Sequence, residues 1–151
     1  MVDDRNNFDE ARDALDESLN QGLEELHSVV LETTIVNMTS GKDALGNKWV
    51  PITEETLHNS RQTRTSSRDA LVDTGEWRAD IVATSANAVD LDEGVAVIGT
   101  TKEFAPAHEF GAPEIGLPRR PIFGPAARLA EQLAPEVMGE ELELRLDEAE
   151  L

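Results

Sequence analysis

Apolar residues in the N-terminal part of the chain recur at steps of three or four, the spacing of one helix face. Seven positions make up this stripe: Phe8, Ala11, Leu15, Leu19, Leu23, Leu26 and Val30. Acidic residues fill the other face, and Gly41 gives a stop signal. The pattern predicts an amphipathic helix of about thirty residues, roughly 45 Å long. A helix of that length either packs one face on something besides its own core or only covers the domain's sheet.

Strand patterns begin in the second half of the chain. Residues 79–86 contain the alternating pair Ile81 and Ala83, and residues 94–100 contain the apolar run Val95 to Ile98. A polar link at 87–93 separates the two segments. This arrangement is typical of an antiparallel hairpin. We expect its second strand to be buried on both faces.

The C-terminal third mixes helical and extended signals. Residues 103–110 favour a short helix, and the prolines and glycines of 111–121 predict an extended loop. Pro125 suits the first turn of a helix that runs through Leu133, because a missing N–H is tolerated there. The final segment, 141–146, alternates charged residues with leucines, which predicts a strand; a helix is the alternative.

Together these elements predict one α+β domain over residues 1–151. It has a long N-terminal helix, a small antiparallel sheet made of the hairpin and the C-terminal strand, and a second helix near the C-terminus. The polar stretch 59–69 has three arginines and no apolar residue. A segment of this composition predicts an exposed, mobile loop.

The net charge of the chain bears on its host and on the partners that it can bind. The chain has 31 acidic and 13 basic residues, a net charge of −18. Such a charge repels itself unless salt screens it, which points to a halophilic host, with an acidic mesophilic protein as the alternative. It also disfavours sequence-specific binding of duplex DNA, which needs cationic groups on phosphates. The chain lacks cysteine, and no apolar run approaches the roughly 20 residues of a membrane span.

Candidate catalytic chemistry is sparse. His108 and Glu109 match the first two residues of the His-Glu-x-x-His motif of zinc proteases. The second histidine of that motif is missing, because position 112 is alanine. Neither a phosphate-binding glycine loop nor a nucleophile elbow is present. We therefore expect no enzyme, and no catalytic, metal-binding or cofactor-binding residue. A small hydrolase that uses His108 is the rival hypothesis.

Four separated motifs lie between residues 41 and 130. In order they are GNKWVPI at 46–52 followed by Thr56, LVDTGEWR at 71–78, FAPAHEFG at 104–111 and LPRRPIFG at 117–124. Their order and spacing resemble the Mu-like virion morphogenesis or tail-completion family. Trp77 stands where that family usually has leucine, Pro106 is unusual inside the histidine motif, and Ile122-Phe123 replaces Phe-Leu or Phe-Ile.

The resemblance implies a structural protein of a tailed virus, here an archaeal one if the host is halophilic. It implies a ring, of six copies if tail symmetry holds, at the head–tail neck or the top of the tail. The partners would be copies of the chain, neighbouring neck or connector proteins and tail tube proteins, with duplex DNA passing through an acidic lumen. The protein would be made in the host cytoplasm and end in the virion. A tail terminator or another connector layer is the alternative.

Candidate assembly contacts come from three features of the sequence. The two tryptophans can bury a large apolar area. The paired arginines between prolines predict a rigid, positively charged projection, the cationic finger. The expected C-terminal strand can extend a neighbour's sheet. The finger would bind carboxylates of a neighbour or of its own domain. The seven candidates are Trp49, Trp77, Arg119, Arg120, Leu142, Leu144 and Leu146.

Overall fold

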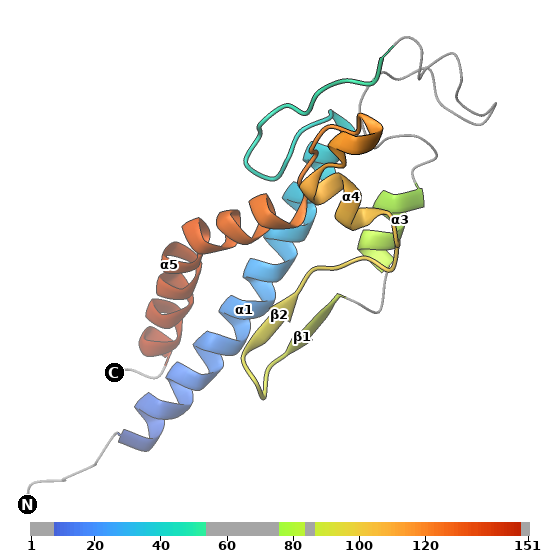
Figure 1. Ribbon diagram of the computed structural model, residues 1–151. Helices are drawn as coiled ribbons and strands as arrows, with labels where there is room; N and C mark the ends of the chain where they lie inside the picture. The colour runs from blue at the N-terminus through green and yellow to red at the C-terminus, as the bar shows by residue number, and fades with distance from the viewer. Residues whose placement is uncertain (1–7, 54–75, 84–86, 149–151) are drawn as a thin grey trace, which may run out of the picture.

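Two long antiparallel helices dominate the computed structural model, which describes residues 8–53, 76–83 and 87–148 (Figure 1). Helix α1 (Phe8–Thr39) and helix α5 (Phe123–Glu148) pack along each other, and the start of α1 lies near the end of α5. The shorter elements lie beside them: α3 (Glu76–Ala83), β1 (Ala88–Asp90), β2 (Val95–Val97), α4 (Ala105–Phe110) and the 3-10 turn η1 (Pro113–Ile115). The α+β prediction is confirmed.

The predicted long N-terminal helix is confirmed, but the face it buries is different. Every fourth residue is buried: Ala14, Ser18, Gly22, Leu26, Val30, Thr34 and Met38. By contrast, Phe8, Leu15 and Leu19 are 78%, 42% and 48% exposed. The predicted stripe is therefore wrong in the first half of α1. There α5 packs against small residues, which let two helices approach closely, and the large apolar side chains stay outside.

The closest approach of the two helices is at Gly22. A Cβ atom at this position would lie 2.5 Å from the Sδ of Met138 on α5. Further along, the Arg145 guanidinium lies 3.6 Å from the Glu17 carboxylate and ties the end of α5 to α1. The middle of the pair buries Leu26 and Val30 with residues of α5.

A leucine at Gly22 should force the helices apart. Overpacking of this kind costs about 1–3 kcal/mol, so Gly22→Leu should lower the free energy of unfolding in urea melts by that amount. Gly139→Leu is the matched control, because within the described part of the chain nothing beyond its own stretch of helix lies within 4 Å of the Cβ position there. That control should gain about 0.5–1 kcal/mol from helix propensity. Equal effects at the two glycines would contradict the close packing of α1 on α5.

The predicted C-terminal strand is wrong, because residues 141–146 belong to α5. Burial along this helix repeats in pairs every four residues, so that 137–138, 141–142 and 145–146 face α1. An alternating Glu-Leu pattern satisfies a helix as well as a strand when a partner helix covers the right face. Pro135 lies inside α5 on an exposed position and does not end the helix.

The hairpin is real but smaller and later than predicted. Residues 76–83 form helix α3, since Trp77 and Ile81, one helical turn apart, are both buried. The two strands pair antiparallel with Ala88 opposite Val97. The expected burial of the second strand on both faces is also wrong: Val95 and Val97 are 45% and 44% exposed. The sheet has only two strands among the described residues, and these valines of β2 stay partly exposed to solvent.

Other local predictions are confirmed or untested. Helix α4 matches the short helix expected at 103–110, and Pro125 lies in the first turn of α5. The expected mobile loop at 59–69 lies outside the described residues. Among the helices that are described, none has a stretch long and apolar enough to cross a membrane.

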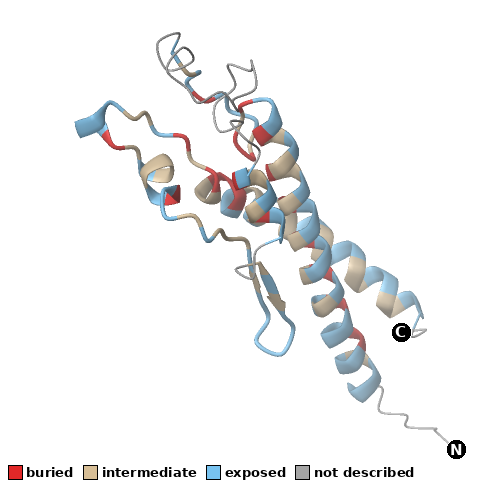
Figure 2. Cartoon of the chain, turned by 90° about the vertical axis from the view of Figure 1, so that its right-hand side faces the viewer, coloured by how far each residue is buried: buried red, intermediate tan, exposed pale blue. Residues whose placement is uncertain are grey.

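The main core forms where the loops meet the second half of α1 (Figure 2). Its buried members are Met38, Trp49, Trp77, Ile81, Ala105 and Ile122. These residues come from α1, the loop after it, α3, α4 and the segment before α5. The core therefore holds together the parts of the chain that carry the four sequence motifs.

Candidate functional site

The motif residues meet at one end of the molecule. Trp49 is 7% exposed and its Nε1 donates to the carbonyl of Pro121 at 3.2 Å. The loop that carries this tryptophan is held by Asp43, whose Oδ1 accepts from the amides of Leu45 and Asn47, both at 2.9 Å. An aspartate that binds backbone amides two and four residues on fixes a tight turn. The first and fourth motifs are thus joined by the indole of Trp49.

Glu109 joins the third motif to the fourth. Its carboxylate accepts from the backbone amides of Ile122, Phe123 and Gly124, at 2.6, 3.0 and 2.8 Å. These amides lie at the start of α5, where helix N–H groups have no partner within the helix. A negative charge is also favoured at a helix N-terminus. A Cβ at Gly124 would lie 3.1 Å from the Glu109 Oε1, so glycine suits this position.

The two arginines of the predicted finger have different environments. Arg120 is 6% exposed, and its Nε donates to the carbonyl of Val50 at 3.0 Å. Its backbone amide donates to the carbonyl of His108 at 2.7 Å. Arg119 is exposed, and its Nε donates to the carbonyl of Glu109 at 2.9 Å. Only Arg119 offers its side chain to a partner at the surface.

His108 packs in an aromatic cluster. Its ring centroid lies 5.2 Å from that of Trp77 and 5.9 Å from that of Phe104. Burial lowers the pKa of His108, and the charge of Arg120 lowers that pKa further. The Nδ1 of His108 and the Nε1 of Trp77 are buried and have no hydrogen-bond partner among the residues that the structure describes. This environment favours a neutral imidazole packed as part of the core.

The low pKa of His108 makes stability depend on pH. Because the folded-state pKa lies below the ordinary value of about 6.5, the unfolded chain takes up the proton first as pH falls. His108 should therefore leave stability unchanged above pH 6.5 and reduce it below. Thermal melts of the unmodified chain and His108→Gln from pH 7.5 to 5 should show the unmodified chain losing more. Melting temperatures that run parallel over this range would contradict the pKa shift.

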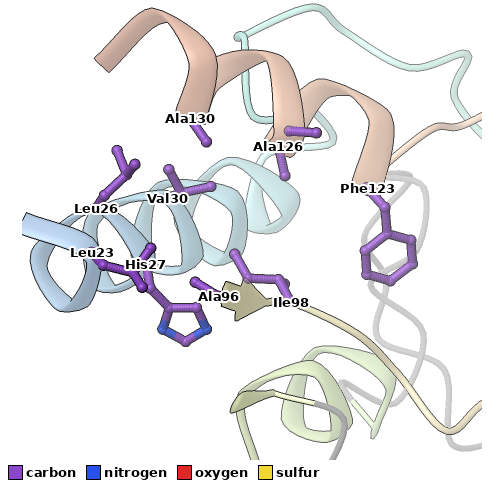
Figure 3. Close-up of a pocket in the computed structure, with 10 residues that line it drawn as sticks. Leu23, Leu26, His27, Val30, Ala96, Ile98, Phe123, Ala126 and Ala130 are labelled. Carbon is purple, nitrogen blue, oxygen red and sulfur yellow. The ribbon is translucent and has the colours of Figure 1, made fainter. Parts of the chain in front are cut away.

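Two hollows lie on the described surface, and His108 lines neither of them. The first is a mostly apolar cavity of about 250 Å³ between α1, β2 and α5 (Figure 3). Leu23 and His27 of α1 project toward Ala96 on one side of it, and the Nε2 of His27 lies 3.0 Å from the carbonyl oxygen of Val97. Ala126 and other small residues of α5 lie on the opposite side.

The second hollow is an open groove of about 660 Å³ beside the start of α5. Its charged lining residues are two cations, Lys102 and Arg119, and two acids, Glu103 and Glu109. Lys102 is also paired with the Glu76 carboxylate at 3.9 Å. Ile98 and Phe123 contribute apolar surface, and Phe110 is 75% exposed beside them. No group of three histidine or acidic side chains that could hold a metal ion occurs in the described parts of the chain.

The seven predicted contact residues differ in how far they are buried. Trp49, Trp77 and Arg120 are buried within the chain, so we assign them to its own core and not to an assembly surface. The leucines of the expected strand lie on α5, where Leu142 and Leu146 are half-buried toward α1 and Leu144 is 48% exposed. The surface candidates that remain are Arg119 and Leu144. Sequence reasoning missed Glu109 as the residue that holds the start of α5.

The chain has no match among protein-family models, curated proteins or solved structures.

Proposed function

We propose that this chain is a structural virion subunit that forms a ring at the head–tail neck or the top of the tail of a tailed virus. The observation that carries the proposal is the exposure of large apolar side chains at both ends of an elongated helix pair. Phe110 and Ile115 are 75% and 74% exposed at one end, and Leu19 and Leu144 are both 48% exposed toward the other. Burying these side chains against neighbouring subunits would remove apolar surface from water, which favours association.

The resemblance to the tail-completion family supports the same function. The first, third and fourth motifs contribute to one core, through Trp49, Glu109 and the amides at the start of α5. Thr56 and residues 71–75 of the motifs lie outside the described residues. A set of motifs that packs together supports a shared fold better than four separate matches would.

The charge supports a place on the path of DNA. A ring built from subunits with a net charge of −18 presents few phosphate-binding groups to its lumen. Since binding to duplex DNA depends on neutralising phosphates, such a lumen lets DNA pass without sticking. Six copies is the number that tail symmetry implies. The surplus of acid also fits a host with a saline cytoplasm, where salt screens repulsion between neighbouring subunits.

Deleting the gene from the virus that encodes this chain tests the function. A missing layer at the joint should yield DNA-filled heads and separate tails in electron micrographs, with infectious titre lost. Restoring the gene in trans should restore joined particles. Joined, infectious particles in the absence of the protein would overturn the proposal.

A further inference from the structure

The apolar cavity between α1, β2 and α5 has walls from all three elements (Figure 3). Leu26 and Val30 of α1 line it and are only 9% and 3% exposed. Ala96 of β2 lies on one side, and Ala126 of α5, which is 3% exposed, lies on the other. The cavity therefore reaches residues of the core and is not a shallow feature of the surface.

Short side chains keep this space open. Helix α5 lines it with Ala126, Ala127 and Ala130, and β2 lines it with Ala96. In the described part of the chain the hairpin packs against α1 and has little contact with α5. Methyl groups are too short to fill the space that remains between the hairpin and α5.

The lining favours a neutral, apolar occupant. His27 is the one polar side chain among the described residues that line the cavity, and its Nε2 already lies 3.0 Å from the Val97 carbonyl oxygen. A charged group would lose its hydration there without gaining a partner of opposite charge. Water is poorly held by such walls, and an apolar group that displaces poorly held water gains affinity.

The volume limits the size of the occupant. An apolar cavity of about 150 Å³, engineered in another protein, binds benzene. Pockets for drug-sized ligands begin at about 300 Å³. At about 250 Å³ this cavity lies between the two, so it has room for one six-membered ring with at most a short substituent.

We propose that the cavity is a binding site for one neutral apolar molecule the size of a single six-membered ring, such as benzene. The occupant contacts α1, β2 and α5 at once, so it links the hairpin to α5 and stabilises the folded chain. The site lies within a single copy, and it does not depend on the ring of the proposed function.

A benzene titration of the unmodified chain tests the site. With alanine methyl groups labelled with carbon-13, the NMR signals of Ala96, Ala126 and Ala130 should shift together and saturate. The dissociation constant should be on the order of 1 mM, as suits a ligand of six carbon atoms. Ala14 and Ala79 lie outside the cavity, and their signals should stay in place.

A polar ring and a filled cavity are the controls. Dioxane, a six-membered ring with two ether oxygens, should bind at least about tenfold more weakly than benzene, because its oxygens find no donor among the lining side chains. Ala130→Leu fills the cavity and should weaken benzene binding at least about tenfold. Ala79→Leu is the matched control, since Ala79 is an exposed residue of α3, and its binding should be unchanged.

Circular dichroism verifies that both variants are folded; if Ala130→Leu is not, the titration of the unmodified chain decides. Saturable shifts confined to the three cavity alanines support the site. Absence of shifts at these alanines, or shifts at Ala79 as large as those at Ala130, would overturn it. Benzene binding by a folded Ala130→Leu variant as strong as that of the unmodified chain would overturn it too.

Discussion

Replacing Trp49 with alanine should lower the free energy of unfolding by about 3–5 kcal/mol, the range for removing a buried tryptophan. The indole is 7% exposed and belongs to the core with Met38 and Ile122. Removing the indole leaves a cavity between the loop after α1 and the segment before α5. The hydrogen bond from Nε1 to the Pro121 carbonyl is lost as well. Urea denaturation at fixed salt measures the change.

Trp49→Phe separates packing from the hydrogen bond. Phenylalanine keeps most of the apolar contact but leaves the Pro121 carbonyl without its donor, which costs about 1–3 kcal/mol. The phenylalanine variant should therefore be clearly more stable than the alanine variant. An alanine variant as stable as the phenylalanine one would show that Trp49 is not a core residue.

Replacing Glu109 with alanine should cost about 2–3 kcal/mol, because charge-assisted hydrogen bonds to three amides are lost at once. The start of α5 should loosen, and hydrogen exchange at the amides of Ile122, Phe123 and Gly124 should speed up. Glu109→Gln keeps an acceptor oxygen and loses the charge, so its effect should be smaller. Hydrogen exchange and urea melts measure both.

Glu103→Gln is the matched control for Glu109. Glu103 lies exposed just before α4 and lines the groove beside the start of α5. Its replacement should change stability by no more than about 0.5 kcal/mol. If Glu103→Gln and Glu109→Ala had equal effects, the capping of α5 by Glu109 would be excluded as a source of stability.

The sequence predicts the length of α1 better than the face it buries. A stripe of apolar residues and the stop at Gly41 depend on local chemistry alone. Which face is covered depends on α5, a partner far along the chain, and α5 packs against Ala14, Ser18 and Gly22. When the position of α5 is unknown, the sequence pattern predicts that large leucines such as Leu15 are buried, and not these small residues.

Two segments that were predicted to be strands are helical, for a different physical reason. In residues 141–146, alternating leucines satisfy a period of two, and the burial of 141–142 and 145–146 satisfies a helix. In residues 76–83, the alternation around Ile81 concealed the four-residue spacing of Trp77 and Ile81. Short patterns fit both periods, so tertiary contacts decide between them.

The candidate site could be predicted only in part. The motifs include Glu109, Arg119 and Arg120, and the sequence predicted a contact role for the two arginines, but no local pattern shows that Glu109 binds amides thirteen to fifteen residues away. Arg119 and Arg120 are adjacent, yet one is exposed and the other buried. That difference follows from the direction of each side chain in an irregular loop, which composition does not specify.

The central claim is that copies of this chain form a ring in the virion, and cryo-electron microscopy of the virus particles that encode it tests this most directly. We predict a closed ring, of six copies, at the neck or the top of the tail. The α1–α5 helix pair should be visible in each copy. Particles that lack the protein, or that hold it as isolated single copies, would contradict the account.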